Sequence, residues 1–541
     1  MKTIFRNGRI YHGRHVFNFD ACSCMVIEGA KIEYLGNESG AHLRIGSELS
    51  RATVVDLGGR SVFPSFIDGH MHFLQFGASL VKVGLDHCKN LEDIRSTIAQ
   101  AAKDRPDAKR ILCRGWRQLS TNRQALTTMI DDIDPRPIFI DADDLHSEWC
   151  NSAALADMGI TRATPDPAGG TIQRDENGDA TGLISEGAVI TLVWPHLIDC
   201  MSREDKLNAM RAAVQAYHAS GYTGVIEMAM DKGSWELLEH LQRNGQLRLR
   251  VAAHWIIIPT GNDAANLVQV QDAIDLHERY NIDSSPDLRI AGIKVICDGV
   301  VDSCTAALST PYLVPPHGTG DMIWTPAALQ KVASKADVAH LQVALHAIGD
   351  AAINSAINVL EGLASVGRRH RIEHLELTHP NDAKRLGKLG ITASIQPVHS
   401  DPSILGAWPE LIGPERCDWA FAHQDFHDHG AQLAIGTDSP TAPHLPLPNL
   451  YVAHTRLSAR DLHGHRKVNQ RSGMELYSAW SAATWGSAYS CFAEGTTGSL
   501  EIGKSADFIV IDGLSSEPDA QSLLTAKVVQ TWMDGQLVYE A

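Results

Sequence analysis

The sequence lacks a long uninterrupted apolar segment. No stretch of it reaches the ~18 consecutive apolar residues that a membrane-spanning helix needs. The first residues, from Met1 to Arg9, meet charged side chains before the apolar core of a signal peptide could form. We therefore expect a cytoplasmic protein with no membrane partner.

Positive charge is also scarce, since 47 lysines and arginines stand against 64 aspartates and glutamates. The formal net charge of −17 has the wrong sign for a surface that binds nucleic acid or an anionic membrane. The simplest role of this charge is solubility. We expect no nucleic-acid partner.

Closely paired cysteines are missing as well. The ten cysteines form no Cys-x-x-Cys motif, and Cys22 and Cys24, which flank one serine, make too loose a pattern for a metal site. Scattered cysteines of this kind are typical of reduced thiols in a cytoplasmic protein. We expect most of the ten to be buried.

What the sequence does contain is an apolar strand, starting at Phe63, that ends in His70-Met-His72. Side chains alternate between the two faces of a strand, so His70 and His72 point the same way. Two imidazoles that project together from a strand end are suited to bind one divalent metal ion. The alternative is a pair of structural histidines.

Both ends of the chain have the pattern of short strands joined by turns. The N-terminal examples are Thr3–Phe5, Cys24–Glu28, Lys31–Leu35 and Ala52–Asp56, and the C-terminal ones are Asp507–Asp512 and Val528–Tyr539. Neither end is large enough to form a good core alone. We therefore predict one small β-sandwich domain built from residues 1–57 and 488–541.

Between the two ends, apolar runs alternate with amphipathic helical stretches, which predicts parallel βα units. The runs are Val62–Ile67, Thr223–Met228, Val251–Ile258, Ile293–Cys297, Gln342–His346, His370–His374, Thr392–Gln396 and Gln432–Gly436. Eight such units predict a (β/α)8 TIM-like barrel over residues 58–80 and 206–487. Residues 81–205 are too long for one helix and include a Gly/Pro-rich stretch, so we predict an insertion that lies over the barrel mouth.

Polar residues gather where the predicted barrel strands end, which is where catalytic groups of such barrels sit. They are His70, His72, Lys294, His346, His374 and Asp438. Four imidazoles and a carboxylate are suited to a metal site. Each also has a structural alternative, and for Asp438 this is capping of the next helix.

Lys294 is unusual because it ends an apolar strand. A bare ammonium there would be repelled by divalent ions and would cost desolvation energy. Either it pairs with an acid such as Asp298, or its amine has taken up carbon dioxide to form an anionic carbamate ligand. The sequence leaves both states, and an ordinary salt bridge, open.

The order His-x-His, Lys, His, His, Asp on eight βα units resembles the amidohydrolase superfamily, namely amidohydrolase family 3 and its N-substituted formamide deformylase-like branch. The similarity covers nearly the whole chain. The stretches that carry it are Arg114–Trp116, Asp144–Leu155, Thr181–Leu183, Lys294–Leu308, His346–Asp350, Arg371–His374, Gly436–Pro440 and Gly498–Asp507.

This resemblance implies a role for each position. His70 and His72 hold one divalent metal with Asp438, while His346 and His374 hold a second. Lys294 takes the place of a carboxylated lysine that bridges the two ions. A metal-bound hydroxide then attacks a carbonyl, and Asp438, the general base, accepts its proton and delivers it to the departing nitrogen. Of the candidate ions, imidazole and carboxylate ligands favour zinc, in one or two copies per chain.

Further residues are candidates for contact with a small-molecule amide, each with structural packing or turn formation as its alternative. They are Trp116, His146, Trp149, Asn151 and Glu186 in the insertion, Ser303 and Thr305 after the fourth strand, and Gln396 and His399 after the seventh. Gln396 and His399 end their strand where either could also approach the metals. The histidines 423, 427 and 429 precede the eighth strand, and we predict that they lie on the surface. Base rates favour a homodimer.

The resulting hypothesis is metal-dependent hydrolysis of a non-peptide C–N bond, in an N-substituted formamide or a related amide. One alternative is hydrolytic deamination of a heterocycle, but such sites commonly use one metal and lack the lysine that Lys294 represents. Another is a non-catalytic regulatory protein on an amidohydrolase scaffold, which should first lose ligands or the general base. None of these residues is missing here.

Overall fold

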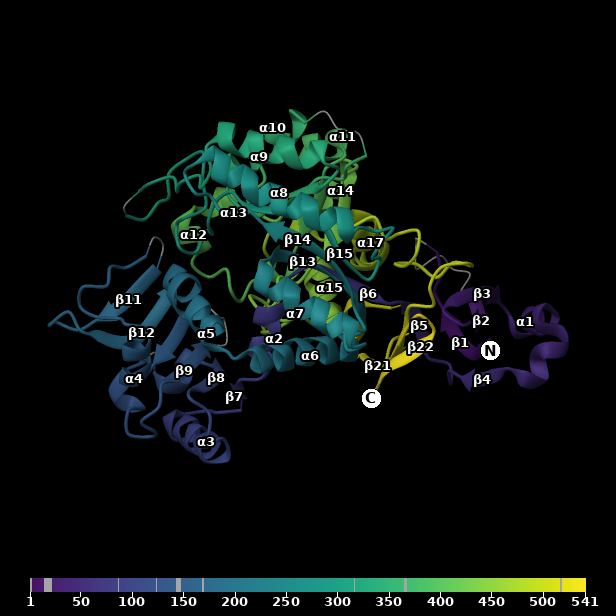
Figure 1. The fold of residues 1–541 in the computed structure, drawn as a ribbon, viewed down its shortest axis with the longest axis horizontal. Coiled ribbons are helices and arrows are strands. Elements are labelled where there is room, and N and C mark those ends of the chain that lie inside the picture. Colours follow the sequence, from purple (N-terminus) through teal and green to yellow (C-terminus); the bar gives the residue numbers. More distant parts are fainter. Residues whose placement is uncertain are drawn as a thin grey trace. The chain divides into compact units, whose positions relative to one another are not determined.

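The computed structural model describes residues 2–13, 22–85, 87–122, 124–142, 147–167, 170–315, 317–363, 367–515 and 518–541. The chain forms two compact units. The first contains Met1–Phe73, Ala213–Val301 and Ala306–Ala541, and the second contains Leu74–Ala212 and Asp302–Thr305. Figure 1 shows the elements of both.

A parallel sheet of eight strands is the centre of the first unit. In their order around the sheet, the strands are β6 (Phe66–Met71), β13 (Tyr222–Met230), β14 (Arg250–Ile256), β15 (Leu288–Ile296), β16 (Gln342–Ala347), β17 (Arg371–His374), β18 (Thr392–Ile395) and β19 (Gln432–Ile435). Nearly all their residues are buried, which explains why they appear in the sequence as continuous apolar runs. This sheet confirms the predicted α/β barrel.

The barrel is nearly closed, because its last strand returns to its first. The residues after β19 bind β6 through Thr437 N, which donates to His70 O at 3.2 Å, and Asp438 N, which donates to the same oxygen at 2.7 Å. His72 N donates in turn to Ser439 O at 2.9 Å. These bonds hold the two histidines and Asp438 at one end of the barrel.

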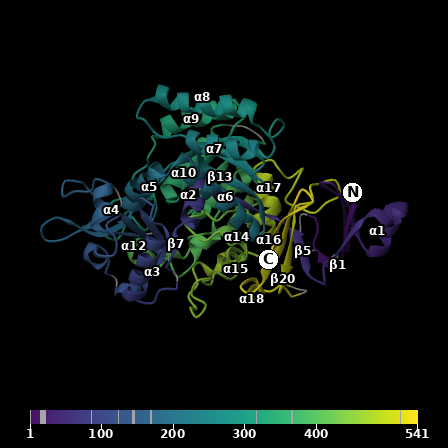
Figure 2. The same cartoon turned by 60° about the horizontal axis from the view of Figure 1, so that its bottom comes forward.

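Helices follow most of the barrel strands, as the alternating pattern predicts. They are α6 (Arg203–Ala219, which begins in the second unit), α7 (Lys232–Arg243), α8 (Asp263–Arg279), α9 (Pro326–Val338), α10 (Asp350–Glu361), α11 (Pro380–Leu389), α12 (Trp408–Leu411), α13 (Pro414–Cys417), α14 (His423–Asp428), α15 (Pro446–Thr455), α16 (Leu476–Ser481) and α17 (Ser487–Ser490). In both views α8 and α9 lie side by side (Figures 1 and 2).

The first predicted strand, Val62–Ile67, is in fact divided between two sheets. β5 (Ser61–Pro64) belongs to a sheet made by the chain ends, whereas β6 begins at Phe66 in the barrel. Pro64 lacks an N–H to continue a ladder, and Ser65 N donates to Asp507 O instead. The division moves the chain from one sheet into the other within two residues.

The two chain ends form one mixed sheet, whose purple and yellow strands lie together in Figure 1. Its members are β1 (Lys2–Ile10), β2 (Cys22–Glu28), β3 (Lys31–Gly36), β4 (Thr53–Asp56), β5, β20 (Phe508–Asp512), β21 (Lys527–Met533) and β22 (Gln536–Glu540), with the short helix α18 (Ala520–Leu523) between β20 and β21. β5 pairs antiparallel with β20 and so joins the two ends. Helix α1 (Glu38–Ile45) packs its Ala41 and Ile45 against one face. The predicted sandwich of two sheets is not confirmed.

The second unit has its own sheet and core. Its strands, in sheet order, are β11 (Gly170–Arg174), β12 (Ala180–Glu186), β10 (Ser147–Cys150), β9 (Ile138–Ala142), β8 (Ile111–Trp116) and β7 (Val83–Gly84). Its helices are α2 (Phe73–Leu80), α3 (Leu91–Asp104), α4 (Ser152–Asp157) and α5 (Trp194–Cys200). The predicted insertion, residues 81–205, falls inside this unit.

Two expectations from composition can be compared with the structure. Within the described ranges, no helix combines the length and apolarity that crossing a bilayer needs. All ten cysteines are free, and six of them are buried. The expectation of mostly buried thiols is therefore confirmed.

Candidate metal centre

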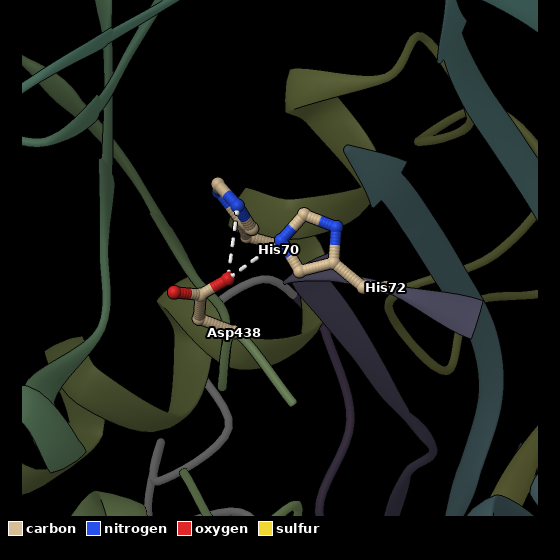
Figure 3. Close-up of side chains that lie close together, drawn as sticks. All are labelled: His70, His72 and Asp438. Carbon is tan, nitrogen blue, oxygen red and sulfur yellow. Dashed lines mark ion pairs between the residues drawn. The ribbon is translucent and has the colours of Figure 1, made fainter. Parts of the chain in front are cut away.

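His70, in β6, and His72, which directly follows β6, face the carboxylate of Asp438, as Figure 3 shows. Asp438 Oδ1 lies 3.3 Å from His70 Nε2 and 3.0 Å from His72 Nε2. Asp438 follows β19 in a left-handed backbone conformation (φ +57°), which residues with Cβ rarely adopt. The closure of the barrel therefore sets this geometry.

His374, His399 and Asp438 form a second group whose donor atoms all lie within 4.8 Å of one another. His374 ends β17, also with a positive φ of +76°. His399 comes from the turn after β18, and its Nε2 lies 3.7 Å from Asp438 Oδ2. Asp438 thus belongs to both groups.

His346, at the end of β16, lies beside His374, with ring centroids 4.4 Å apart. Its Nε2 faces the Gly299 carbonyl oxygen at 3.4 Å and lies 3.7 Å from Asp298 Oδ1. The predicted pair of His346 and His374 is therefore brought together, although among the described residues His346 joins no cluster of three donors.

Unpartnered buried atoms mark the space between these residues. Among the described residues, His70 Nε2, His374 Nδ1 and Asp438 Oδ1 are buried without a hydrogen-bond partner. Such atoms cost free energy unless something else binds them. Two ligands about 2.1 Å from one tetrahedral zinc are roughly 3.4 Å apart, close to the spacings around Asp438. This donor set fits a divalent cation.

The protonation states also suit metal ligands, which must present a free lone pair. Burial lowers the pKa of His374 well below its usual value and, with Lys294 nearby, lowers the pKa of His346 to about 3. Burial alone would raise the pKa of Asp438, but His70 and His72 outweigh it and hold that pKa well below its usual value. His346 and His374 are therefore neutral imidazoles, and Asp438 is ionised.

Lys294 lies in β15 and is buried, with only 2% of its surface exposed. Burial lowers the pKa of its amine. The expected partner Asp298 is engaged elsewhere, because it accepts backbone N–H bonds from Ala307, Ile348 and Gly349 at 2.8–3.0 Å. The carboxylates of Glu373, Asp438 and Glu227 oppose that lowering of the Lys294 pKa, so pairing with an acid other than Asp298 stays an alternative to carboxylation.

Sequence reasoning missed the residues that orient the ligands. Glu373 Oε2 lies 2.8 Å from His70 Nδ1, and Arg371 donates to the same carboxylate at 2.8 Å. Arg371 and His70 outweigh the effect of burial and hold the pKa of Glu373 well below its usual value. Near His72, Glu227 Oε1 lies 3.9 Å from Nδ1. Arg371 and Glu373 are two residues apart on one face of the strand that ends at His374, so the sequence could have indicated that these two side chains pair with each other.

Three predicted substrate contacts lie in the core of the second unit instead. Trp116 and Trp149 pack with ring centroids 5.2 Å apart, and their indole N–H groups donate to Thr121 Oγ1 and the Leu126 carbonyl oxygen. Asn151 accepts two backbone N–H bonds and donates one more, all inside this unit. Substrate contact by these three is not supported, because they are buried and bonded as structural residues.

The remaining predicted substrate contacts lie in several different surroundings. His146 and the side chain of Glu186 lie outside the described part of the chain. The Ser303 and Thr305 hydroxyls bond each other at 2.8 Å in the second unit. Gln396 is buried after β18, and neither of its amide atoms has a hydrogen-bond partner among the described residues.

The predicted surface position of His423 is wrong. It is fully buried, and its Nδ1 lies 3.3 Å from Nη1 of the buried Arg456. His427, in helix α14, and His429, its C-cap residue, are exposed as predicted. His423 differs because it begins the helix and contacts the buried Arg456.

A parallel barrel with imidazoles and a carboxylate at its strand ends has the architecture of a metal-dependent hydrolase. A model of the amidohydrolase family matches residues 53–539. The chain belongs to this family.

Two relatives and one solved structure extend the comparison. The chain is 28% identical to "Putative amidohydrolase YtcJ" of Bacillus subtilis over the full length of both chains. It is 23% identical to the N-substituted formamide deformylase of Arthrobacter pascens, over 95% of this chain and 94% of that protein. The structure of an uncharacterized metal-dependent hydrolase from Pyrococcus horikoshii OT3 is 26% identical, with a TM-score of 0.74, over 95% of this chain and 97% of that one. Together these findings identify the chain as a hydrolase.

Proposed function

We propose that this hydrolase uses a divalent metal, with zinc as the best-suited ion, to cleave the C–N bond of a small amide. An N-substituted formamide is the proposed substrate, because a relative along almost the whole chain is a deformylase of that class. The observation that carries the proposal is the convergence of His70, His72 and His374 on Asp438 at the ends of three barrel strands.

A divalent ion bound there would supply a Lewis acid that lowers the pKa of water and polarises a carbonyl oxygen. Asp438 is ionised and so is able to accept one proton from the attacking water as the new C–O bond forms. It then delivers that proton to the nitrogen as the C–N bond breaks, which gives a carboxylic acid and an amine. Glu373 keeps His70 in one orientation throughout.

Lys294 has two possible chemical forms in this proposal, a free amine and a carboxylated lysine. A carboxylated Lys294 would add an anionic oxygen between two ions, and its burial without a bond to Asp298 supports that form. High-resolution diffraction from crystals grown with zinc and bicarbonate tests it. Density for three extra atoms on Nζ is expected, and a bare amine would contradict it.

The test of function is a substrate panel with the zinc-loaded protein. It should contain N-substituted formamides, acyl amides, lactams, carbamates and amino-substituted heterocycles. Release of formate from the formamides is expected. Ammonia release from the heterocycles alone would instead establish a deaminase, and no turnover of any compound would favour a non-catalytic protein.

A further inference from the structure

The two ring nitrogens of His399 face two different carboxylates. Nδ1 lies 3.4 Å from Glu376 Oε1, and Nε2 lies 3.7 Å from Asp438 Oδ2. The ring lies parallel to that of His374, with 6° between the planes and 6.0 Å between the centroids. Glu376 is itself buried, so water does not compete strongly for this contact.

His70 shows the same arrangement on the other oxygen of Asp438. Its Nδ1 lies 2.8 Å from Glu373 Oε2, and its Nε2 lies 3.3 Å from Asp438 Oδ1. A carboxylate that accepts from one ring nitrogen fixes the tautomer, so the other nitrogen presents its lone pair. This is the usual environment of a histidine that binds a metal ion.

We propose that His399 is a ligand of a second divalent cation, together with His374, and that Glu376 is the positioning residue for His399. The inference rests on the proposed metal centre, and it adds a ligand to the set predicted from the sequence. Asp438 Oδ1 lies beside His70 and His72, whereas Oδ2, 3.7 Å from His399 Nε2, stays free to accept the proton in the proposed hydrolysis.

The local contacts favour this role over a purely structural one. Thr441 Oγ1 lies 3.4 Å from His399 Nε2, and that hydroxyl already donates to the Asp438 carbonyl oxygen at 2.6 Å. His374 Nδ1 is buried without a hydrogen-bond partner within the described ranges. Donor atoms of His374, His399 and Asp438 therefore lie within 4.8 Å of one another, and one of the imidazole nitrogens there has no bond to the described part of the protein.

The experiment is a zinc titration of the full-length protein after removal of metal by a chelator. It compares wild type with His399→Ala, His399→Asn and Glu376→Gln, and with His427→Ala as the control, since His427 is exposed on α14. Cobalt(II) absorption provides a second readout, because its visible spectrum reports the ligands directly. Circular dichroism confirms that each variant is folded.

Wild type is expected to bind two equivalents of zinc. The His399 variants should keep the first affinity and weaken the second about 100-fold, and Glu376→Gln should weaken it by about 10–100-fold. The cobalt spectrum should change in the same variants. If wild type binds one equivalent only, the second cation is absent and the proposal is overturned.

Unchanged zinc affinity and an unchanged cobalt spectrum in both folded His399 variants would overturn it. This outcome differs from failure of the proposed function, in which zinc binds as expected but the substrate panel shows no turnover. Metal binding and substrate turnover thus test the two proposals separately.

Discussion

The residues of the candidate metal centre and three predicted contact residues in the second unit all bury polar side chains, but their polar atoms are used differently. In the second unit, Trp116, Trp149 and Asn151 each use their polar atoms in bonds to neighbouring residues. At the barrel mouth, atoms of His70, His374 and Asp438 are buried without hydrogen-bond partners among the described residues, and they face a common space. Buried polarity that is satisfied indicates structure, whereas converging unsatisfied atoms indicate a ligand site.

A lone unsatisfied atom does not make a site. His254, in β14, is fully buried and pairs its Nε2 with Gln342 Oε1 at 2.9 Å, while its Nδ1 lacks a hydrogen-bond partner in the described part of the chain. It belongs to none of the donor clusters found there. The convergence of several such atoms is therefore the informative feature.

The largest expected effect is that of Asp438→Asn. The amide keeps an oxygen as a metal ligand but is unable to accept the proton, so turnover should fall by about 10²–10⁴-fold while the first zinc equivalent stays bound. Steady-state kinetics and metal analysis measure the two quantities. Asp519→Asn, at the exposed N-cap of α18, is the control and should leave both unchanged. Wild-type turnover in Asp438→Asn would show that another group moves the proton.

Glu373→Gln tests the orienting carboxylate. Loss of the negative charge beside His70 Nδ1 should weaken zinc binding by about 10–100-fold, as measured by competition with a chromophoric chelator. Glu494→Gln removes a carboxylate from Arg369 away from the site and is the matched control. Equal zinc affinity in both variants would mean that Glu373 serves the fold alone.

Asn151→Ala tests the claim that the buried polar residues of the second unit are structural. It removes the N-cap of α4 and leaves Ile138 N without its acceptor, so the free energy of unfolding should fall by about 2–3 kcal/mol. Zinc content should not change. Asn262→Ala, an exposed N-cap of α8, should cost only about 1 kcal/mol. Loss of zinc in a folded Asn151→Ala protein would contradict the assignment of Asn151 to structure.

The smallest effect is expected from the lone unsatisfied histidine. Burial lowers the pKa of His254 to about 3, below its ordinary value of 6.5, so between these pH values the unfolded chain binds more protons. Its contribution to stability is complete above pH 6.5 and is lost as the pH falls. Between pH 6.5 and 5.5 that loss is about 1 kcal/mol. His254→Gln should remove this part of the pH dependence in urea unfolding, and identical pH dependence in both proteins would refute it.

The barrel could be predicted from the sequence because buried parallel strands are continuous apolar runs, and each run can be recognised without knowing its neighbours in the sheet. His70 and His72 were visible because strand periodicity puts neighbours two apart on one face. Contacts between side chains that are far apart in the sequence could not be predicted. Glu373 and His70 are 303 residues apart, and the inward turn of His423 depends on Arg456, 33 residues further on. The division of the first predicted strand at Ser65 likewise depends on pairing between the chain ends.

Anomalous diffraction at the zinc edge, from crystals of the zinc-loaded protein, tests the central claim most directly. We expect a peak within about 2.3 Å of the Nε2 atoms of His70 and His72 and of an Asp438 oxygen. Absence of any peak between these side chains, at full zinc loading, would contradict the account.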